Sequence, residues 1–333
     1  MKHTTRDIIT PEVAVTLDGL FQERANRSPN AIAYQYYDDV SSDWLEISWY
    51  EMTQEISRWQ SAMINEGLRE GDRVAIMLKN CPKWVIFDQA ALGLGLITVP
   101  LYTADRPENV AHVLGDSGAK LLLIDSAEHW HPLHEATNEL LELKRIVCIK
   151  TPPEGDDDNR LRGIDEWLPE HGDQFHHKIK CKDQLATIVY TSGTMGKSKG
   201  VMLSHYNLLY DSWASVQTYD VNEGDTLLSL LPLSHTLERM GGYCIPIMVG
   251  AKELPTQDRF NNSKKILQRL NQLRSLRFRE CLKELNQELK SNWINNLSIR
   301  NSYLSSQSIL DITYSNTNKK EVVGDLAFYY GQF

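Results

Sequence analysis

The 333-residue chain lacks several features that mark specialised classes of protein. No apolar run reaches the roughly 18–20 residues that a bilayer-spanning helix needs. The N-terminal segment MKHTTRDIIT has no apolar core of a secretory signal, and the five cysteines include no C-x-x-C pair. The net charge is −9, so the overall charge gives no reason to expect nucleic-acid binding. We therefore expect a cytoplasmic protein without a transmembrane segment, whose cysteines are reduced thiols that mostly fill the core.

Glycine, proline and tryptophan are scarce after residue 254. Residues 255–333 hold two of the 19 glycines, one of the 12 prolines and one of the eight tryptophans. Their net charge is +5, against −14 for the rest of the chain. One amphipathic helical face is discernible between Ile266 and Leu276, and little periodicity follows Ser291. We expect this tail to be poorly structured or helical.

Residues 1–254 alternate between helix and strand patterns. Apolar residues at helical spacing predict helices over 51–65, 83–92 and 107–114, and another helix after His205. Short apolar runs predict strands over 73–78, 97–102, 120–125, 145–150, 185–190, 201–203 and 226–231. This alternation predicts an α/β fold with a largely parallel sheet, with Trp84 and Trp213 as core anchors.

The segment YTSGTMGKSKG, residues 190–200, is the most informative stretch of the chain. Three glycines permit tight turns and close approach of a ligand to the backbone. Three hydroxyl side chains and two lysines accompany them, and such a loop can present N–H groups and cations to a polyphosphate. The alternative is a surface glycine turn with solvated lysines.

A second nucleotide-binding interpretation rests on Gly196-Lys197-Ser198, which looks like the end of a Walker A loop. That motif needs glycine where this chain has Thr191, and a helix directly after the serine. Residues 199–203 instead have a strand pattern. A P-loop phosphotransferase is therefore the second hypothesis, and a helix beginning near Lys197 would support it.

The run YTSGTMGKSKGVMLSH resembles the ATP-phosphate loop of AMP-forming adenylating enzymes, the acyl-CoA synthetase and luciferase superfamily. The family pattern is close to YTSGTTG-x-PKG, and this chain departs from it at Met195 and Ser198. Three further runs resemble segments of bacterial long-chain fatty-acid CoA ligases: GDRVAIMLKN (71–80), VPLYTADRPEN (99–109) and LPLSHTLER (231–239). The resemblance covers about residues 15–252.

The resemblance implies the N-terminal portion of an adenylate-forming large domain, with mixed parallel sheets and flanking helices. It implies that a fatty acid and ATP form acyl-adenylate, from which CoA displaces AMP. Mg²⁺ would neutralise the phosphates with Thr194 as a ligand, and His235 would act at the acyl–adenylate junction. The residues implied in holding ATP are Thr191, Ser192, Gly193, Thr194, Gly196, Lys197, Lys199 and Gly200. No nucleic-acid partner is implied, peripheral membrane contact is compatible with a fatty substrate, and the oligomeric state stays open.

The family segments that form the adenosine pocket and carry the catalytic lysine are not found after residue 252. When the codons beyond 252 are read from their third base, the permitted residues include IKPTALISVPRMFER, which resembles the family at this point. We therefore expect residues 1–252 to be a truncated AMP-binding domain and residues 253–333 to be an out-of-frame tail. The C-terminal domain with the catalytic lysine would be absent and this chain inactive. A non-catalytic phosphate-binding fragment is a third hypothesis.

Other polar clusters carry weaker signals. The histidines of HWHPLH, residues 129–134, fit no standard metal-ligand spacing, and we expect a surface turn. His176 and His177, and the acidic run from Glu154 to Asp158, are expected to be solvated.

Overall fold

The computed structural model describes residues 7–255, apart from 39–40, 137–139, 141, 154–157, 179–180, 192–196, 219–220 and 230. The predicted tail therefore lies outside the described residues, except for residues 253–255. Ser192, Gly193, Thr194 and Gly196 of the predicted phosphate loop also lie outside them. The chain divides into two compact units, Met1–Arg259 and Phe260–Phe333, and every described residue belongs to the first.

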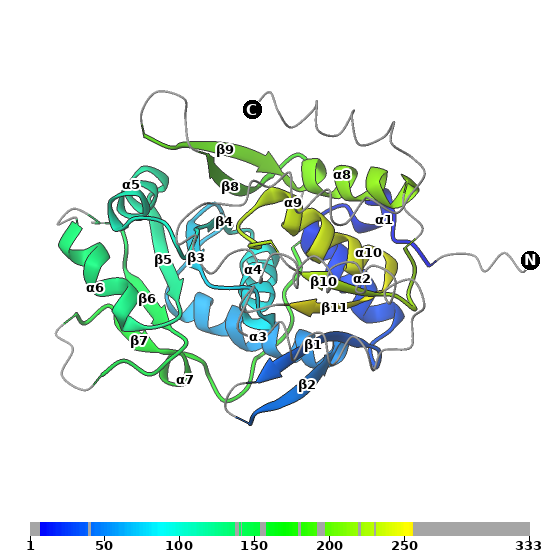
Figure 1. Cartoon of the computed structure of the whole chain (residues 1–333), viewed down its shortest axis with the longest axis horizontal. Helices are drawn as coiled ribbons and strands as arrows, with labels where there is room; N and C mark the ends of the chain where they lie inside the picture. Colours follow the sequence, from blue (N-terminus) through cyan, green and yellow to red (C-terminus); the bar gives the residue numbers. More distant parts are fainter. Residues whose placement is uncertain are drawn as a thin grey trace, which may run out of the picture. The chain divides into compact units, whose positions relative to one another are not determined.

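Helices and strands alternate along most of this unit (Figure 1). The helices are α1 (Pro11–Ala14), α2 (Leu17–Arg27), α3 (Trp49–Asn65), α4 (Pro82–Leu94), α5 (Pro107–Ser117), α6 (Ala127–Ala136), α7 (Ile164–Trp167), α8 (His205–Thr218), α9 (Thr236–Glu238), the π-helix η1 (Arg239–Cys244) and α10 (Ile245–Val249). The strands are β1 (Ile32–Asp38), β2 (Asp43–Ser48), β3 (Arg73–Met77), β4 (Ile97–Pro100), β5 (Ala119–Ile124), β6 (Arg145–Cys148), β7 (Leu161–Gly163), β8 (Leu185–Thr191), β9 (Lys199–Ser204), β10 (Thr226–Ser229) and β11 (Lys252–Pro255).

A seven-stranded sheet has the order β7-β6-β5-β3-β4-β8-β9. All its neighbours are parallel except β8 and β9, which form an antiparallel hairpin at one edge. The carboxyl ends of β3, β4 and β8 therefore lie along one edge of the sheet, where open α/β sheets bind ligands. A second sheet has the order β10-β11-β1-β2, with β11 parallel to both of its neighbours.

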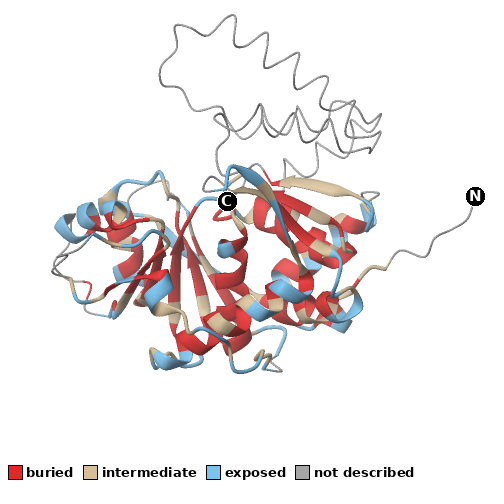
Figure 2. Cartoon of the chain, turned by 90° about the horizontal axis from the view of Figure 1, so that it is seen from below, coloured by how far each residue is buried: buried red, intermediate tan, exposed pale blue. Residues whose placement is uncertain are grey.

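Both faces of the large sheet are buried. Along β3, Val74 and Ile76 join one apolar cluster, which contains α3 and α4 residues, whereas Ala75 and Met77 join another, which contains α5 and α6 residues. This alternation follows from the two-residue period of a strand. Figure 2 shows the buried residues concentrated in the strands and in the helices between them.

Helix α4 is buried at every residue except Lys83 and has clear end signals. Pro82 occupies its first turn, and Gly95 ends it with a left-handed φ of 79°. Its sequence is apolar on all sides, as expected for a helix that is covered all round.

The predicted α/β fold and its strands are confirmed, each within a few residues of its predicted bounds. The sequence analysis missed the β1–β2 hairpin, and it was wrong about the histidine-rich segment. That segment is helix α6 rather than a turn, and His134 stacks on Trp130 with ring centroids 5.5 Å apart. Trp84 is fully buried as predicted, whereas Trp213 is only partly buried.

The cysteine prediction holds in part. The described cysteines are free thiols, and Cys148 and Cys244 are buried, but Cys181 is exposed and Cys81 is half-buried. Within the described part of the chain, no helix is both long and apolar enough to cross a membrane.

Candidate active site

The β8–β9 hairpin positions both ends of the predicted phosphate loop. Thr191 pairs with Lys199, and Tyr190 pairs with Gly200, so these residues come together where the hairpin opens. Thr191, Lys197 and Lys199 are exposed there. The loop of the hairpin follows the carboxyl end of β8. Lys197, Lys199 and the Thr191 hydroxyl therefore lie at the edge of the sheet where open α/β sheets bind ligands.

Contacts with helix α5 hold the hairpin. The Tyr190 hydroxyl donates a hydrogen bond to Asp116 at 2.6 Å, and desolvation together with this carboxylate raises the pKa of Tyr190. On the returning side, His112 Nε2 lies 3.1 Å from the carbonyl oxygen of Ser198. These two contacts fix the segments on either side of the loop.

Gly200 has a packing reason to be glycine. A Cβ atom there would lie 2.7 Å from Ile188 Cγ2 and 3.1 Å from Tyr190 Cζ. Such distances are too short for a normal carbon–carbon contact. The residue therefore lets the Tyr190 ring lie against β9.

The strand β9 decides against the P-loop hypothesis. A Walker A loop continues into a helix at its Lys-Ser end, whereas residues from Lys199 to Ser204 form an extended strand paired with β8. The second hypothesis from the sequence is therefore wrong.

The Asn80 side chain holds the segment that leads to His235 through three hydrogen bonds, which we call the Asn80 clamp. Its Nδ2 atom donates to the Leu231 carbonyl at 2.6 Å and to Ser229 Oγ at 2.8 Å. Its Oδ1 atom accepts from the Leu233 backbone N–H at 2.9 Å. Asn80 follows the end of β3, so the segment that precedes His235 is fastened near the same edge of the sheet where β8 ends. The sequence analysis missed this role, because the partners are about 150 residues apart.

His235 begins the short helix α9. Its Nδ1 atom accepts a hydrogen bond from the Leu237 backbone N–H at 3.2 Å, which requires that nitrogen to be unprotonated. The ring has an exposed surface, yet the neighbouring chain removes enough water to lower its pKa. Glu238 also binds the segment that Asn80 holds, since Glu238 Oε2 accepts a hydrogen bond from the Leu231 backbone N–H at 3.1 Å. No hydrogen bond among the described residues joins His235 to Thr191, Lys197 or Lys199.

A buried ion pair supports the helical segment after His235. Arg239 Nη2 lies 2.5 Å from Asp88 Oδ1, and both side chains are almost fully buried. Arg239 also donates to Thr187 and Thr98, and Tyr243 donates to Asp88 at 2.9 Å. Since these partners lie on β8, β4 and α4, the pair joins the π-helix η1 to the large sheet.

Two histidine and acid predictions need correction. His177 is not solvated: its Nδ1 atom lies 2.6 Å from Oδ2 of the fully buried Asp18. Asp158 is not solvated either. It binds Arg160 at 2.7 Å and accepts from Trp130 Nε1 at 3.0 Å, and Arg160 is the main cause that lowers the pKa of Asp158 to about 2.

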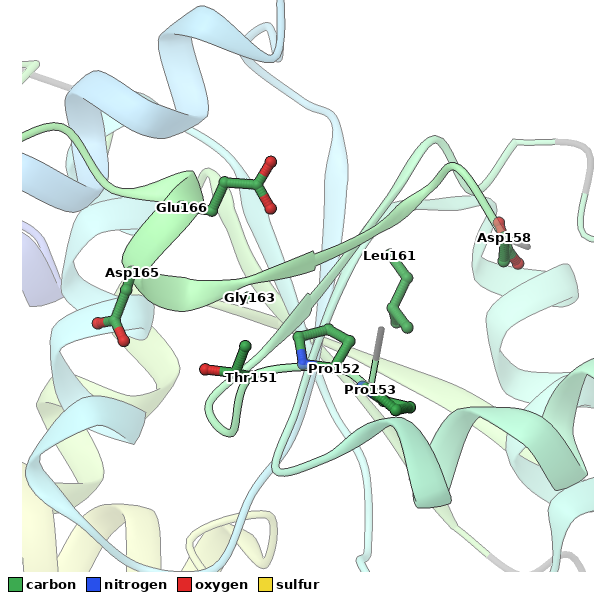
Figure 3. A pocket seen from close by; sticks show the side chains of 8 residues that line it. All are labelled: Thr151, Pro152, Pro153, Asp158, Leu161, Gly163, Asp165 and Glu166. Atoms are coloured by element: carbon green, nitrogen blue, oxygen red, sulfur yellow. The ribbon is translucent and has the colours of Figure 1, made fainter. Parts of the chain in front are cut away.

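A cavity of about 330 Å³ lies away from the predicted phosphate loop in the fold, beside β7 and α7 (Figure 3). Its walls carry three carboxyl side chains, and the residues that line it are Thr151, Pro152, Pro153, Asp158, Leu161, Gly163, Asp165 and Glu166. Carboxylates repel a polyphosphate, so this cavity does not suit ATP. Among the described residues, no group of three or more His, Cys, Asp or Glu side chains could hold a metal ion.

Comparison with known proteins decides the family. Residues 21–274, more than half of the chain, match the AMP-binding enzyme family. The protein belongs to this family. The match extends beyond residue 252, where we placed the end of the family region.

Individual relatives agree with this assignment. The chain is 26% identical over 234 residues to a long-chain-fatty-acid–CoA ligase, heimdall, of Drosophila melanogaster, covering 66% of this chain and 34% of the relative. It is 29% identical over 223 residues to the long-chain-fatty-acid–CoA ligase FadD15 of Mycobacterium bovis, covering 65% and 36%. The fold resembles the anthranilate CoA ligase AuaEII in complex with anthranoyl-AMP, with a TM-score of 0.67 at 20% identity, over 77% of this chain and 47% of that chain. The chain thus spans about a third of the length of the curated relatives it matches.

Proposed function

We propose that this chain is the ATP-phosphate-binding part of an AMP-forming acid–CoA ligase, and that the acid is a long-chain fatty acid. The hairpin carries the first part of the proposal. Its loop lies at the carboxyl edge of a parallel sheet, and Thr191, Lys197 and Lys199 are exposed at this end of the hairpin. Backbone N–H groups and cations in such a loop suit a polyphosphate. The fatty acid rests on the names of the two curated ligases, which act on long-chain acids.

The residues of the loop divide into three groups in this proposal. Lys197 and Lys199 attract the phosphates, and the hydroxyl groups of Thr191, Ser192 and Thr194 donate hydrogen bonds to phosphate oxygens. The glycines let the backbone approach the phosphates closely, and they are Gly193, Gly196 and Gly200. Thr194 supplies a hydroxyl for Mg²⁺, which reduces repulsion among the phosphate oxygens. His235 lies at the junction between acid and adenylate, and its unprotonated Nδ1 is committed to the Leu237 N–H. CoA is the second substrate, which accepts the acyl group.

We also propose that the chain beyond residue 252 is read out of frame, so that this chain binds ATP weakly and does not complete the reaction. The composition break near residue 254 and the family-like residues permitted in the other frame support this idea. The described cysteines are free thiols, which suits the expected cytoplasmic location.

Measurement of ATP binding and of pyrophosphate release tests the phosphate site and the expected inactivity. We expect the chain to bind ATP in the presence of Mg²⁺, and Lys199→Ala to weaken the binding about tenfold, because a charge-assisted contact to phosphate is lost. Lys178→Ala is the matched control, since it removes an exposed cation elsewhere on the unit. We expect no pyrophosphate from ATP and palmitate.

Two outcomes would contradict the account. Equal ATP affinities of Lys199→Ala and Lys178→Ala would contradict the proposal that Lys199 binds the phosphates. Pyrophosphate release above background would show that the chain is active despite its tail. Binding without release is also the outcome for a non-catalytic phosphate-binding fragment, which is the second candidate.

A further inference from the structure

Glu253 is a buried acid in the middle of the four-stranded sheet. It lies on β11, where it pairs with Tyr34 of β1 on one side and with Leu227 of β10 on the other. Only 1% of the residue is exposed. Neither carboxylate oxygen has a hydrogen-bond partner of normal geometry among the described residues.

The groups around Glu253 do not compensate for its burial. The Tyr34 and Ser229 hydroxyls favour its charged form, whereas Glu238 disfavours it. The buried thiol of Cys244 also interacts with it. No cation among the described residues acts on it. Burial therefore dominates and raises the pKa of Glu253 well above its ordinary value of 4.5.

The position itself suits an apolar side chain. A strand with parallel neighbours on both sides is usually an apolar run rich in Val, Ile and Leu. The preceding residue, Lys252, reaches the half-exposed Glu46 with Nζ–Oε1 of 3.5 Å, and the following residue, Leu254, is fully buried. Pro255, which lacks a backbone N–H, then pairs with Ser229 although β11 is an interior strand. Two of the three residues after Lys252 thus fit a central strand poorly.

The genetic code gives the alternative at this position. Every Glu codon ends in A or G, and every Leu codon begins with CT or TT. After a gain of two bases at codon 253, the original codon 253 starts at the present third base and therefore encodes Thr, Ala, Ile or Val. All four are small or β-branched, and three of them are favoured in strands.

We propose that Glu253 is the first residue after a shift of reading frame, that it occupies a site built for Thr, Ala, Ile or Val, and that its carboxyl group weakens the small sheet as the pH rises. The assignment to a frame junction rests on the reading frame proposed above. The pH effect does not, because it follows from the burial and the missing partners alone. A carboxyl group whose pKa is raised by folding stabilises the fold fully below its unfolded pKa and loses that contribution as the pH rises towards the folded value.

The test is thermal unfolding of the full chain between pH 4.5 and 8, with Glu253→Val and Glu253→Gln. We expect Glu253→Val to raise the midpoint by roughly 5–10 °C at pH 8 and by little at pH 4.5, since it removes an uncompensated buried charge. Glu253→Gln should remove the pH dependence but keep a buried polar group. Glu223→Gln is the control, because Glu223 is exposed and precedes β10 in the same sheet.

The results distinguish the buried-acid inference from the assignment of Glu253 to a frame junction. A lower midpoint for Glu253→Val at pH 8, or the same pH slope in Glu253→Gln and the unchanged chain, would overturn the buried-acid inference. If the variants behave as expected but the gene holds a single frame, the frame junction is wrong and the buried-acid inference stands.

Discussion

Asn80 Nδ2 lies 2.6 Å from the carbonyl oxygen of Leu231, and Asn80 Oδ1 lies 2.9 Å from the backbone nitrogen of Leu233. One side chain at the end of β3 therefore holds two backbone groups of the segment that leads to His235. An amide is the side chain that can donate and accept in this way at once. The relationship connects the end of a sheet strand with a candidate active-site residue about 150 positions further along the chain.

Substitution of Asn80 should release this segment. We expect Asn80→Ala to lower the free energy of unfolding by about 2–3 kcal/mol, because it removes three hydrogen bonds, two of them to buried partners. The loss can be measured by urea unfolding followed through tryptophan fluorescence. Asn207→Ala, which removes local bonds to Ser204 at the junction of β9 and α8, should cost less than about 1.5 kcal/mol. Equal losses in the two variants would contradict the clamp.

The buried pair of Asp88 and Arg239 should be intolerant of single changes. Arg239→Met leaves Asp88 buried and charged without its cation, and we expect a loss of about 3–5 kcal/mol in the free energy of unfolding. Lys150→Met is the control, since it removes an exposed cation from its pair with Asp125 and should cost less than about 1 kcal/mol. The double variant with Asp88→Leu should recover part of the loss. No recovery would show that packing, rather than the unpaired charge, accounts for it.

The thiols should react in an order set by burial. Cys181 is exposed and should be alkylated before the other cysteines of the described part of the chain by iodoacetamide. Cys244 should stay unmodified until the chain unfolds, because burial raises its pKa to about 12 and keeps it as the unreactive thiol. Peptide mass mapping distinguishes the sites. Early modification of Cys244 would contradict the packing of η1 against α8 and the small sheet.

Asp158 should stabilise the fold at neutral pH. Its partner Arg160 lowers the pKa of Asp158 to about 2 from an ordinary value of 3.8. The contribution is therefore complete above pH 3.8 and is lost as the pH falls towards 2. We expect Asp158→Asn to lower the free energy of unfolding by about 1–2 kcal/mol at pH 7, and by much less near pH 2. Asp165→Asn, at an exposed carboxyl group, should have little effect at either pH; a difference between Asp158→Asn and the unchanged chain that does not vary with pH would contradict this assignment.

The repeating pattern of the large sheet could be predicted from the sequence because its strands are apolar runs between clear helices. Helix α4 shows why: proline at its start, glycine at its end and apolar residues between are all local signals. The β1–β2 hairpin gave no such signal. Most of β2 is exposed or half-buried, and Ser42 takes a left-handed φ of 56° without a glycine.

The parts of the candidate site also differ in whether a local sequence pattern reveals them. The phosphate loop is one continuous run of residues, so the sequence alone is enough to propose its chemistry. The Asn80 clamp, the Asp88–Arg239 pair and the Asp18–His177 contact each join residues more than 140 positions apart. Only the fold brings such residues together, and no local pattern reveals them.

Sequencing of the gene from codon 245 to beyond the present stop codon tests the central claim most directly. The account predicts one of two results: a corrected sequence that lacks two of the bases near codons 252–253, or an unchanged sequence whose other frame continues with an adenine-binding segment and a catalytic lysine. The first result would make residues 1–252 the phosphate-binding part of an acid–CoA ligase with an intact frame, and the second would make them part of a ligase whose frame is broken at Glu253. An unchanged sequence at codons 252–253, whose other frame soon reaches a stop codon, would contradict the account.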